Sequence, residues 1–441
     1  MTDYLSVALD DVPARCSVRE GAFTKSQQHV MRNCYEPVFT WDTDHLTSSF
    51  FEDWTWNGRR FRGNVRPRTF WDGTSVSTAI LADVIEKKLM REGLSPQLNC
   101  LGDQLEFTVT EPYGPLLSVL TQEDALVVSE DERGTGVYRI GHWEKDLIQI
   151  EKASMLPQHK SMPKAVNFRP YTNVDDIMAS LLDGETDVAY ELPYAVLRDG
   201  HRRLDIQIHP IHSINSLQFN CRRLSREVRR AIRTSIDWHA ILDRVHENVG
   251  TVPHGILPPA TVGYDPTLAE YDVTRDSKFA SLQGLRLDLL TRPSPISSDL
   301  WATAIADALR PLGASLSVHP LSVGDTITRM RDGNFDLAQL GFQIGPEPFS
   351  FFRDVFSTHG PANLTGFQSD EVDRLVQEAR LVGQESDRRQ VYAAIQRIVL
   401  DEVPIIGTRH GYAIIASRVE RPVPLRPHPD GMVIVERGNW S

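Results

Sequence analysis

Short apolar runs alternate with amphipathic segments along most of the 441-residue chain. Runs that are short enough for single strands lie at 166–169, 285–290 and 316–318. Segments with apolar residues at helical spacing lie at 174–182 and 299–312, and a glycine that can end a helix follows each of them, Gly184 and Gly313. The strand, helix and strand between residues 285 and 318 form a β-α-β unit. This alternation predicts an α/β protein.

Residues 387–400 have a helical period. Val391, Ile395, Ile398 and Val399 fall on one face, which predicts a helix that packs on a core. The remaining positions include three arginines that we expect to face solvent, Arg388, Arg389 and Arg397.

The length of the chain exceeds the usual reach of one hydrophobic core, so we expect two or three lobes. No low-complexity linker of more than a few residues separates the halves, which favours lobes joined by crossing strands. The composition, 41% hydrophobic and 24% charged, is typical of a soluble globular protein. The net charge of −12 disfavours nucleic acid as a partner, because phosphates need a basic surface.

The patterns that often indicate catalysis or metal binding are weak. Gly134-Thr135-Gly136 resembles the start of a dinucleotide loop, but the following residues predict a strand instead of a helix. His209 and His212 have a chelating spacing without a further pair to support it, and no GxSxG elbow occurs. We therefore expect a protein without a catalytic centre, metal or cofactor.

The cysteines are too few and too scattered for a disulfide framework. No CxxC spacing, which would suggest a metal site, occurs among them. We expect free, buried thiols at all four positions, Cys16, Cys34, Cys100 and Cys221.

Six sequence blocks lie in one order across residues 1 to 420. They are Val65–Val84, with an Asp-Gly turn before a Ser/Thr-capped helix, and the segments 134–140, 181–189, 219–237, 333–338 and 366–375. In content and order they resemble the family 5 extracytoplasmic solute-binding proteins, the oligopeptide-, dipeptide- and nickel-binding subunits of ABC importers. Trp71 stands where that family usually has His. From the residues, we expect Phe70 and Trp71 to lie in the core of a small inserted subdomain and Asn220 to fasten a strand at the hinge.

The resemblance implies a two-lobed α/β fold like that of the periplasmic binding proteins (type II, cluster C), with an extra subdomain inserted in the first lobe. Lobe I would comprise residues 1–216 and 409–441, with the insertion at about 42–160, and lobe II residues 217–408. Two crossings, near 216–219 and 406–409, would form a hinge. A small organic ligand, such as a peptide or peptide-like metabolite, would bind in the cleft between the lobes and be buried by hinge closure. The resemblance also implies ABC permease subunits as partners if the protein is exported, and we expect a monomer.

The loop 341–349 resembles a family loop whose acidic residue holds the α-ammonium of a peptide. Gly345 stands at that position here, so the end of the ligand beside it should be neutral or anionic unless another acid, such as Glu347, replaces the anchor. Arginine near the cleft can pair with a ligand carboxylate or form a salt bridge between the lobes. The candidate ligand-binding residues are Ser17, Arg19, Tyr190, Glu191, Gln343, Glu347, Phe349, Arg409 and His410.

The first ten residues predict a strand and do not resemble an export signal. Two localisations stay open: an extracytoplasmic protein whose signal was removed, or a cytoplasmic protein that begins at Met1. Two alternative functions stay open with the second, a cytoplasmic ligand sensor and a biosynthetic enzyme built on the solute-binding fold.

Overall fold

The structure is a computed structural model. It describes residues 4–9, 11–20, 23–42, 45–153, 162–190, 192, 202–246, 249–259, 261–270, 281–291, 298–425 and 427–435. In this part of the chain every helix is too short or too polar to span a lipid bilayer.

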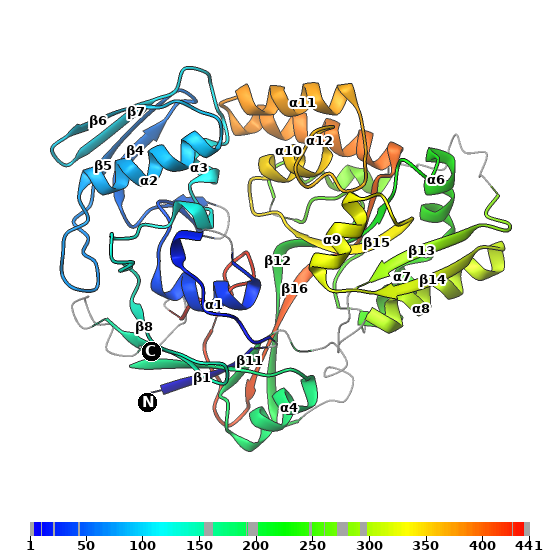
Figure 1. The fold of residues 1–441 in the computed structure, drawn as a ribbon, viewed down its shortest axis with the longest axis horizontal. Helices are drawn as coiled ribbons and strands as arrows, with labels where there is room; N and C mark the ends of the chain where they lie inside the picture. Colours follow the sequence, from blue (N-terminus) through cyan, green and yellow to red (C-terminus); the bar gives the residue numbers. More distant parts are fainter. Residues whose placement is uncertain are drawn as a thin grey trace.

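A mixed ten-stranded sheet runs through the molecule in the order β14-β13-β15-β12-β16-β11-β1-β10-β9-β8. The two longest strands, β12 (Leu204–Phe219) and β16 (Ile405–Arg418), pair antiparallel near its middle. Their register shifts between Pro210 and Ile214 and again between Asn215 and Ser216, which marks β-bulges. In Figure 1 these strands run side by side through the centre of the molecule and connect its two halves.

One half contains the strands at one end of the sheet and two helices. These are β1 (Tyr4–Leu9), β8 (Tyr138–Trp143), β9 (Ile148–Lys152), β10 (Ala165–Pro170), β11 (Val188–Tyr190), α1 (Lys25–Cys34) and α4 (Val174–Asp183). The other half contains β13 (Arg286–Thr291), β14 (Ser315–Pro320) and β15 (Leu337–Gln343), with α6 (Arg226–Ser235), α7 (Trp238–His246), α8 (Ser298–Leu309) and α9 (Val323–Arg331).

A separate antiparallel sheet, in the order β4-β5-β7-β6, lies beside these halves. It consists of β4 (Phe51–Trp56), β5 (Arg60–Val65), β6 (Gln97–Leu101) and β7 (Gln104–Thr108), and the nearby elements are β2 (Thr40–Asp42), β3 (His45–Thr47), α2 (Thr78–Arg91) and α3 (Leu116–Val119). Three further helices follow β15, α10 (Phe349–Phe356), α11 (Asp370–Leu381) and α12 (Glu385–Glu402). The short 3₁₀ helices are η1 (Val18–Glu20), η2 (Glu123–Ala125), η3 (Pro266–Glu270) and η4 (Arg310–Leu312).

The local sequence signals are confirmed where they concern helix ends. The helix α4 begins after Asn173, whose side chain accepts a hydrogen bond from the Asp176 N–H at 2.8 Å, and it ends at Gly184 with φ +82°. Gly313, with φ +83°, ends the α8–η4 segment in the same way. The β-α-β unit is also confirmed, because β13 and β14 pair in parallel.

Two predictions about exposure are wrong. Arg388 is buried, with 6% of its surface exposed, because its guanidinium pairs with Glu347, which lies 41 residues earlier in the chain. All four cysteines are free, but Cys100 is exposed and only Cys34 is fully buried. Cys100 lies on β6, the edge strand of the small sheet, where it is not covered.

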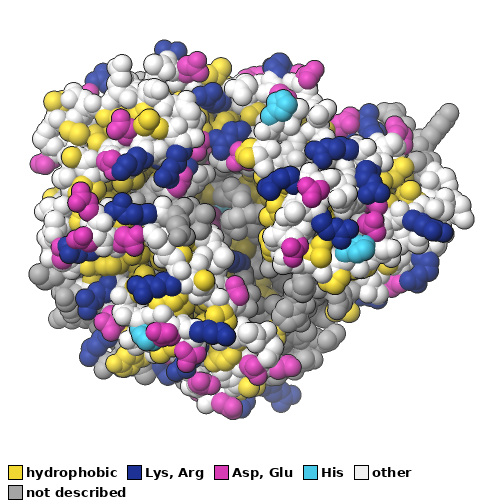
Figure 2. All heavy atoms as spheres, viewed as in Figure 1, with side chains coloured by type: hydrophobic (Ala, Val, Ile, Leu, Met, Phe, Trp, Pro, Cys, Tyr) yellow, Lys and Arg dark blue, Asp and Glu magenta, His cyan; other side chains and the backbone are white. Residues whose placement is uncertain are grey.

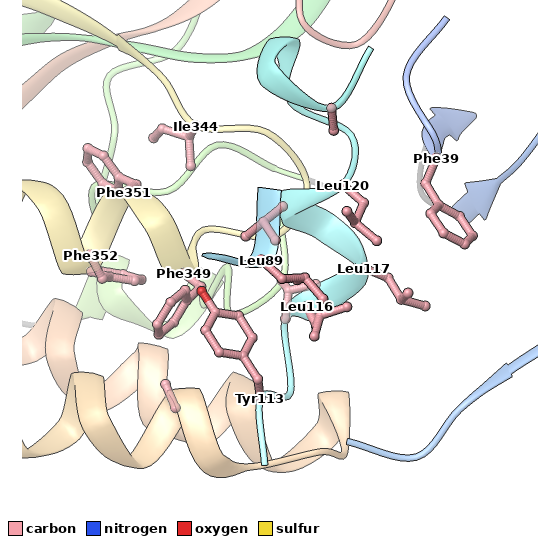
Figure 3. Close-up of a cluster of buried hydrophobic side chains, with 14 of the residues drawn as sticks. Phe39, Leu89, Tyr113, Leu116, Leu117, Leu120, Ile344, Phe349, Phe351 and Phe352 are labelled. Carbon is pink, nitrogen blue, oxygen red and sulfur yellow. The ribbon is translucent and has the colours of Figure 1, made fainter. Parts of the chain in front are cut away.

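The small sheet and the helices α10–α12 share one hydrophobic core. Figure 3 shows Leu89 and Leu116 from one side of this core facing Phe349 from the other, and the rings of Tyr113 and Phe349 meet edge to face at 5.5 Å. A salt bridge between Glu92 and Arg353 borders the contact. This contact sets the position of the small sheet against α10. The residue boundaries of the lobes and the inserted subdomain stay a prediction.

The helix α12 leads directly into the central strand β16. Val403, between them, has φ +51°, a left-handed conformation that is rare for a β-branched residue. Arg229 Nε donates to the carbonyl oxygens of Glu402 and Val403, both at 3.1 Å. This turn is therefore fixed by a buried arginine.

Two of the six sequence blocks meet around Trp71 and Gly134. Trp71 Nε1 donates to the Gly136 carbonyl at 3.0 Å, and the Trp71 N–H donates to the Gly134 carbonyl at 3.2 Å. Phe70 is buried, while Trp71 is partly buried against a second core. Asn220 fastens its strand as predicted, with its amide donating to the carbonyl oxygens of Gly333 and Phe335.

We predict that Gly134→Ala destabilises the protein by about 1–3 kcal/mol, because an added Cβ would lie 2.2 Å from the Cys34 carbonyl oxygen. The matched control is Gly324→Ala on α9, where the nearest heavy atom is 4.0 Å away, and it should be neutral or stabilise by up to about 1 kcal/mol. The measurement is the urea midpoint of unfolding, and equal midpoints for Gly134→Ala and the unsubstituted protein would contradict the prediction.

Candidate functional site

A cavity of about 440 Å³ is lined by residues of α1, η2, the C-terminal segment and the β15–α10 loop. This volume is within the range of binding sites for small organic molecules. Figure 2 shows that the viewed face is hollowed between the two halves of the molecule. The lining residues are Gln28, Arg32, Trp41, Ser118, Thr121, Gln122, Glu123, Asp124, Gln343, Ile344, Gly345, Glu347, Ser350, Asp430 and Met432.

The β15–α10 loop is fixed from both sides. The Ile344 N–H donates to the His212 carbonyl at 2.8 Å, and the Pro346 carbonyl accepts from the Val262 N–H at 2.8 Å. Gly345 has φ +75°, and a Cβ added there would meet no heavy atom within 4 Å. Only the left-handed backbone, and not a lack of space, therefore disfavours a side chain at this position.

Glu347 lines the cavity, but its carboxylate is occupied. It accepts from Arg388 Nη2 at 2.8 Å and Nε at 3.2 Å, and from the Tyr392 hydroxyl at 2.5 Å. Burial raises the pKa of Glu347, although the positive charge of Arg388 opposes the effect. The pair holds the loop against α12.

The other acidic lining residues differ in their partners. Asp124 pairs with Lys88 Nζ at 2.9 Å. Burial would raise the pKa of Asp430, but His428, Arg32 and His212 together outweigh burial and lower that pKa to about 2. Glu123 Oε2 accepts from the Phe23 N–H at 3.0 Å.

Glu123 differs from the other acidic lining residues in its interactions with charged side chains. No ion pair within 4 Å joins it to any residue that the structure describes. Burial raises its pKa to about 7, while the Phe23 N–H and the charge of Arg32 act in the opposite direction. A partly buried carboxylate whose pKa is raised is stabilised either by taking up a proton or by a nearby cation.

The predicted residues of the β15–α10 segment lie near one another. Gln343 and Glu347 line the cavity. Phe349 is buried in the core shared with the small sheet, with 2% of its surface exposed. A role of these residues in ligand binding stays a prediction.

Tyr190 lies behind the cavity wall. Its hydroxyl donates to the Gly431 carbonyl, next to the lining residue Asp430, and its ring meets that of His29 at 4.7 Å. Tyr190 therefore supports the segment that carries Asp430. Glu191 lies outside the described residues.

The structure places the remaining four predicted residues away from the cavity lining. Ser17 donates to Glu132, and Arg19 donates to the carbonyl oxygens of Ser129 and Glu130 at 3.0 and 2.8 Å. These bonds fasten the N-terminal loop to residues 129–132, and a ligand role for Ser17 and Arg19 stays a prediction.

Arg409 and His410 lie on β16 at the bulged part of the ladder with β12. With its amide turned so that the oxygen faces the guanidinium, Asn215 accepts from Arg409 Nη2 at 2.8 Å. His410 Nδ1 lies 3.0 Å from the Thr251 hydroxyl. Burial lowers the pKa of Arg409 to about 10 and that of His410 to about 4. Both residues therefore contribute buried polar groups to the bulged part of the β12–β16 ladder.

Sequence reasoning missed the part of the cavity lining that α1, η2 and the C-terminal segment provide. Gln28 and Arg32 are four residues apart on α1, so they share a helical face, and this spacing is the one local signal that was available. Glu123 and Asp430 come from unrelated segments without such a signal. Among the described residues, no group of three or more metal-ligating side chains occurs.

Comparisons with known proteins agree with this architecture. The sequence profile of "Bacterial extracellular solute-binding proteins, family 5 Middle" matches residues 102–363, more than half of the chain. A probable D,D-dipeptide-binding periplasmic protein of Escherichia coli K12 is 23% identical over 384 residues, covering 76% of this chain and 73% of that protein. A dipeptide-binding protein of the same organism is 19% identical, covering 72% of this chain and 66% of its own length. The chain thus spans about two thirds to three quarters of these relatives.

Solved structures share the fold over nearly the whole chain. NikA of Staphylococcus aureus, in complex with Ni(L-His)₂, has a TM-score of 0.80 at 15% identity and 99% coverage of both chains. A dipeptide-binding protein of Pseudoalteromonas sp. SM9913, in complex with Met-Leu, has a TM-score of 0.80 at 18% identity, with 99% of this chain and all of that chain covered. These neighbours confirm the two-lobed α/β fold, and together with the profile match they show that the chain belongs to the bacterial extracellular solute-binding proteins of family 5.

Proposed function

We propose that this protein captures a small organic ligand, peptide or peptide-like, in the cavity between its lobes and presents it to the permease subunits of an ABC importer. The observation that carries this proposal is the cavity of about 440 Å³, lined from both sides of the β12–β16 connection by charged and amide side chains. Such a lining provides hydrogen bonds and charges for a polar solute, and no covalent step is needed.

The named relatives support a peptide-like ligand. Two of them are described as dipeptide-binding proteins, and one structural neighbour holds the dipeptide Met-Leu. We propose in addition that the protein acts as a monomer and does not bind nucleic acid, in keeping with its net charge of −12.

The β15–α10 loop gives the site its own specificity. Gly345 contributes no charge to the cavity wall, and Glu347 on the same loop is already paired with Arg388. An ammonium group beside this loop would lose its hydration without gaining a free carboxylate. We therefore propose that the ligand end next to Gly345 is neutral or anionic.

We predict that Gly345→Asp increases the affinity for peptides with free N-termini by about tenfold. A charge-assisted hydrogen bond contributes about 1.5–3 kcal/mol to binding. Placing aspartate in the left-handed backbone at this position reduces that gain by about 1 kcal/mol. The measurement is calorimetric titration with di- to pentapeptides and their N-acetylated forms, whose affinity should not change. An unaltered ratio of free to acetylated affinity would contradict the prediction, and so would tight binding of free peptides beside this loop that survives both Glu347→Gln and Glu191→Gln.

We predict that ligand makes the protein more compact. Among the described strands, β12 and β16 pair across the centre of the large sheet. We expect this pair to act as a hinge, so a bound solute should shift the population toward the closed form. The measurement is small-angle scattering of the stripped protein with and without the tightest peptide of the panel. A radius of gyration that stays constant at saturation would count against hinge closure.

A further inference from the structure

The carboxylates in the cavity lining outnumber its cations. The lining contains Glu123, Asp124, Glu347 and Asp430, while Arg32 is the one Lys or Arg among the described lining residues. A wall with this balance attracts a positively charged group of a solute. The carboxylate that receives this group must be one that the protein has not already paired with a cation of its own.

Three of the four acids already have a partner from the protein. Lys88 pairs with Asp124 at 2.9 Å, and Arg388 pairs with Glu347 at 2.8 Å. His428 Nδ1 lies 3.2 Å from Asp430. A ligand cation would have to compete with these interactions.

Glu123 is the exception. Its Oε2 accepts from the Phe23 backbone N–H at 3.0 Å, and the neutral Gln28 side chain lies beside it in the lining. These neutral groups hold the carboxylate in place without neutralising its charge. Because they come from the residues before and within α1, the carboxylate is fixed against the start of that helix.

The geometry points to Glu123 as the residue that binds a protonated amine of the ligand and selects for it. This inference rests on the proposed function, since it names the ligand chemistry of the same cavity. The amine would bind at Glu123, on the wall formed by α1 and η2, and an acid introduced at Gly345 would offer it a second carboxylate in the same cavity. Arg32 on the same wall adds a positive charge, so the wall suits a zwitterion better than a diamine.

The raised pKa of Glu123 agrees with this assignment, and it gives a measurement on the empty protein. The charged groups around Glu123 are Arg32 on α1, Asp124 on η2 and Asp430 on the C-terminal segment. Since the pKa of Glu123 is about 7 in the fold and about 4.5 in the unfolded chain, the folded protein holds an extra proton between these values. The contribution of protonated Glu123 to the free energy of unfolding is therefore lost as the pH rises from 4.5 through 7.

We predict that Glu123→Gln, which keeps an acceptor for the Phe23 N–H, unfolds at the same temperature as the unsubstituted protein at pH 4.5 and roughly 2 °C higher at pH 8. The measurement is thermal unfolding of the ligand-free protein at both pH values. The control is Glu130→Gln, which removes an exposed carboxylate outside the lining and should show no such difference. An equal effect of Glu123→Gln at the two pH values would contradict an unpaired, buried carboxylate.

The binding experiment compares L-alanyl-L-alanine and longer free peptides with their N-acetylated forms on the unsubstituted protein, Glu123→Gln and Glu130→Gln. The unsubstituted protein should prefer the free amine by roughly tenfold to a hundredfold, the strength of a hydrogen bond to a charged group. Glu123→Gln should lose this preference, and Glu130→Gln should keep it.

The outcomes separate the two proposals. If free peptides bind the unsubstituted protein and Glu123→Gln with the same preference, the role of Glu123 is overturned and solute binding stands. If no peptide of the panel binds, the solute that co-purifies with the protein is identified by mass spectrometry. A solute with a basic amine that is lost from Glu123→Gln supports the assignment, and a solute without a basic nitrogen overturns it. If no solute binds or co-purifies at all, the proposed function fails, and the assignment of Glu123 fails with it.

Discussion

The antiparallel pairing of β12 with β16 is the interaction on which the rest of the structure depends. These strands occupy the centre of the ten-stranded sheet, and the strands of the two halves continue from their outer edges. The cavity lies between elements from both halves, so its shape follows from the register of this pair. The bulges between Pro210 and Ser216 interrupt that register at the centre of the molecule. A β-ladder that has fewer regular backbone hydrogen bonds at one point bends more easily there than elsewhere.

Local sequence signals were sufficient for the elements whose ends are decided by one or two residues. Gly184 and Gly313 end their helices because each adopts a left-handed backbone that other residues avoid. The periodic residues of α12 packed inward as predicted, but Arg388 did not face solvent. Helical periodicity reports which side of a helix is apolar, and it cannot report a carboxylate brought from another part of the chain, as Glu347 is.

The candidate site was only half visible in the sequence. The β15–α10 loop resembles a loop of the family, so the sequence itself drew attention to Gln343, Gly345 and Glu347. The rest of the lining comes from α1, η2 and the C-terminal segment, which are far apart in the chain. Glu123 and Asp430 have no common motif, and only tertiary packing brings them to one cavity. The aromatic residues Phe349 and Tyr190 also have structural contacts that the sequence did not show, since Phe349 packs in the shared core and Tyr190 donates to the Gly431 carbonyl.

The path of α12 links the cavity to the centre of the molecule mechanically. Near its first turn, Arg388 holds Glu347 of the cavity wall, and at its other end the turn at Val403, fixed by Arg229, leads directly into β16. The helix has 18 residues, a length of about 27 Å, and behaves as a stiff rod over that distance. A force applied to the β15–α10 loop is therefore carried along the helix to the start of the central strand. A flexible joint at Val403 would let the helix move without the strand, whereas a turn held by a buried arginine makes the two move together.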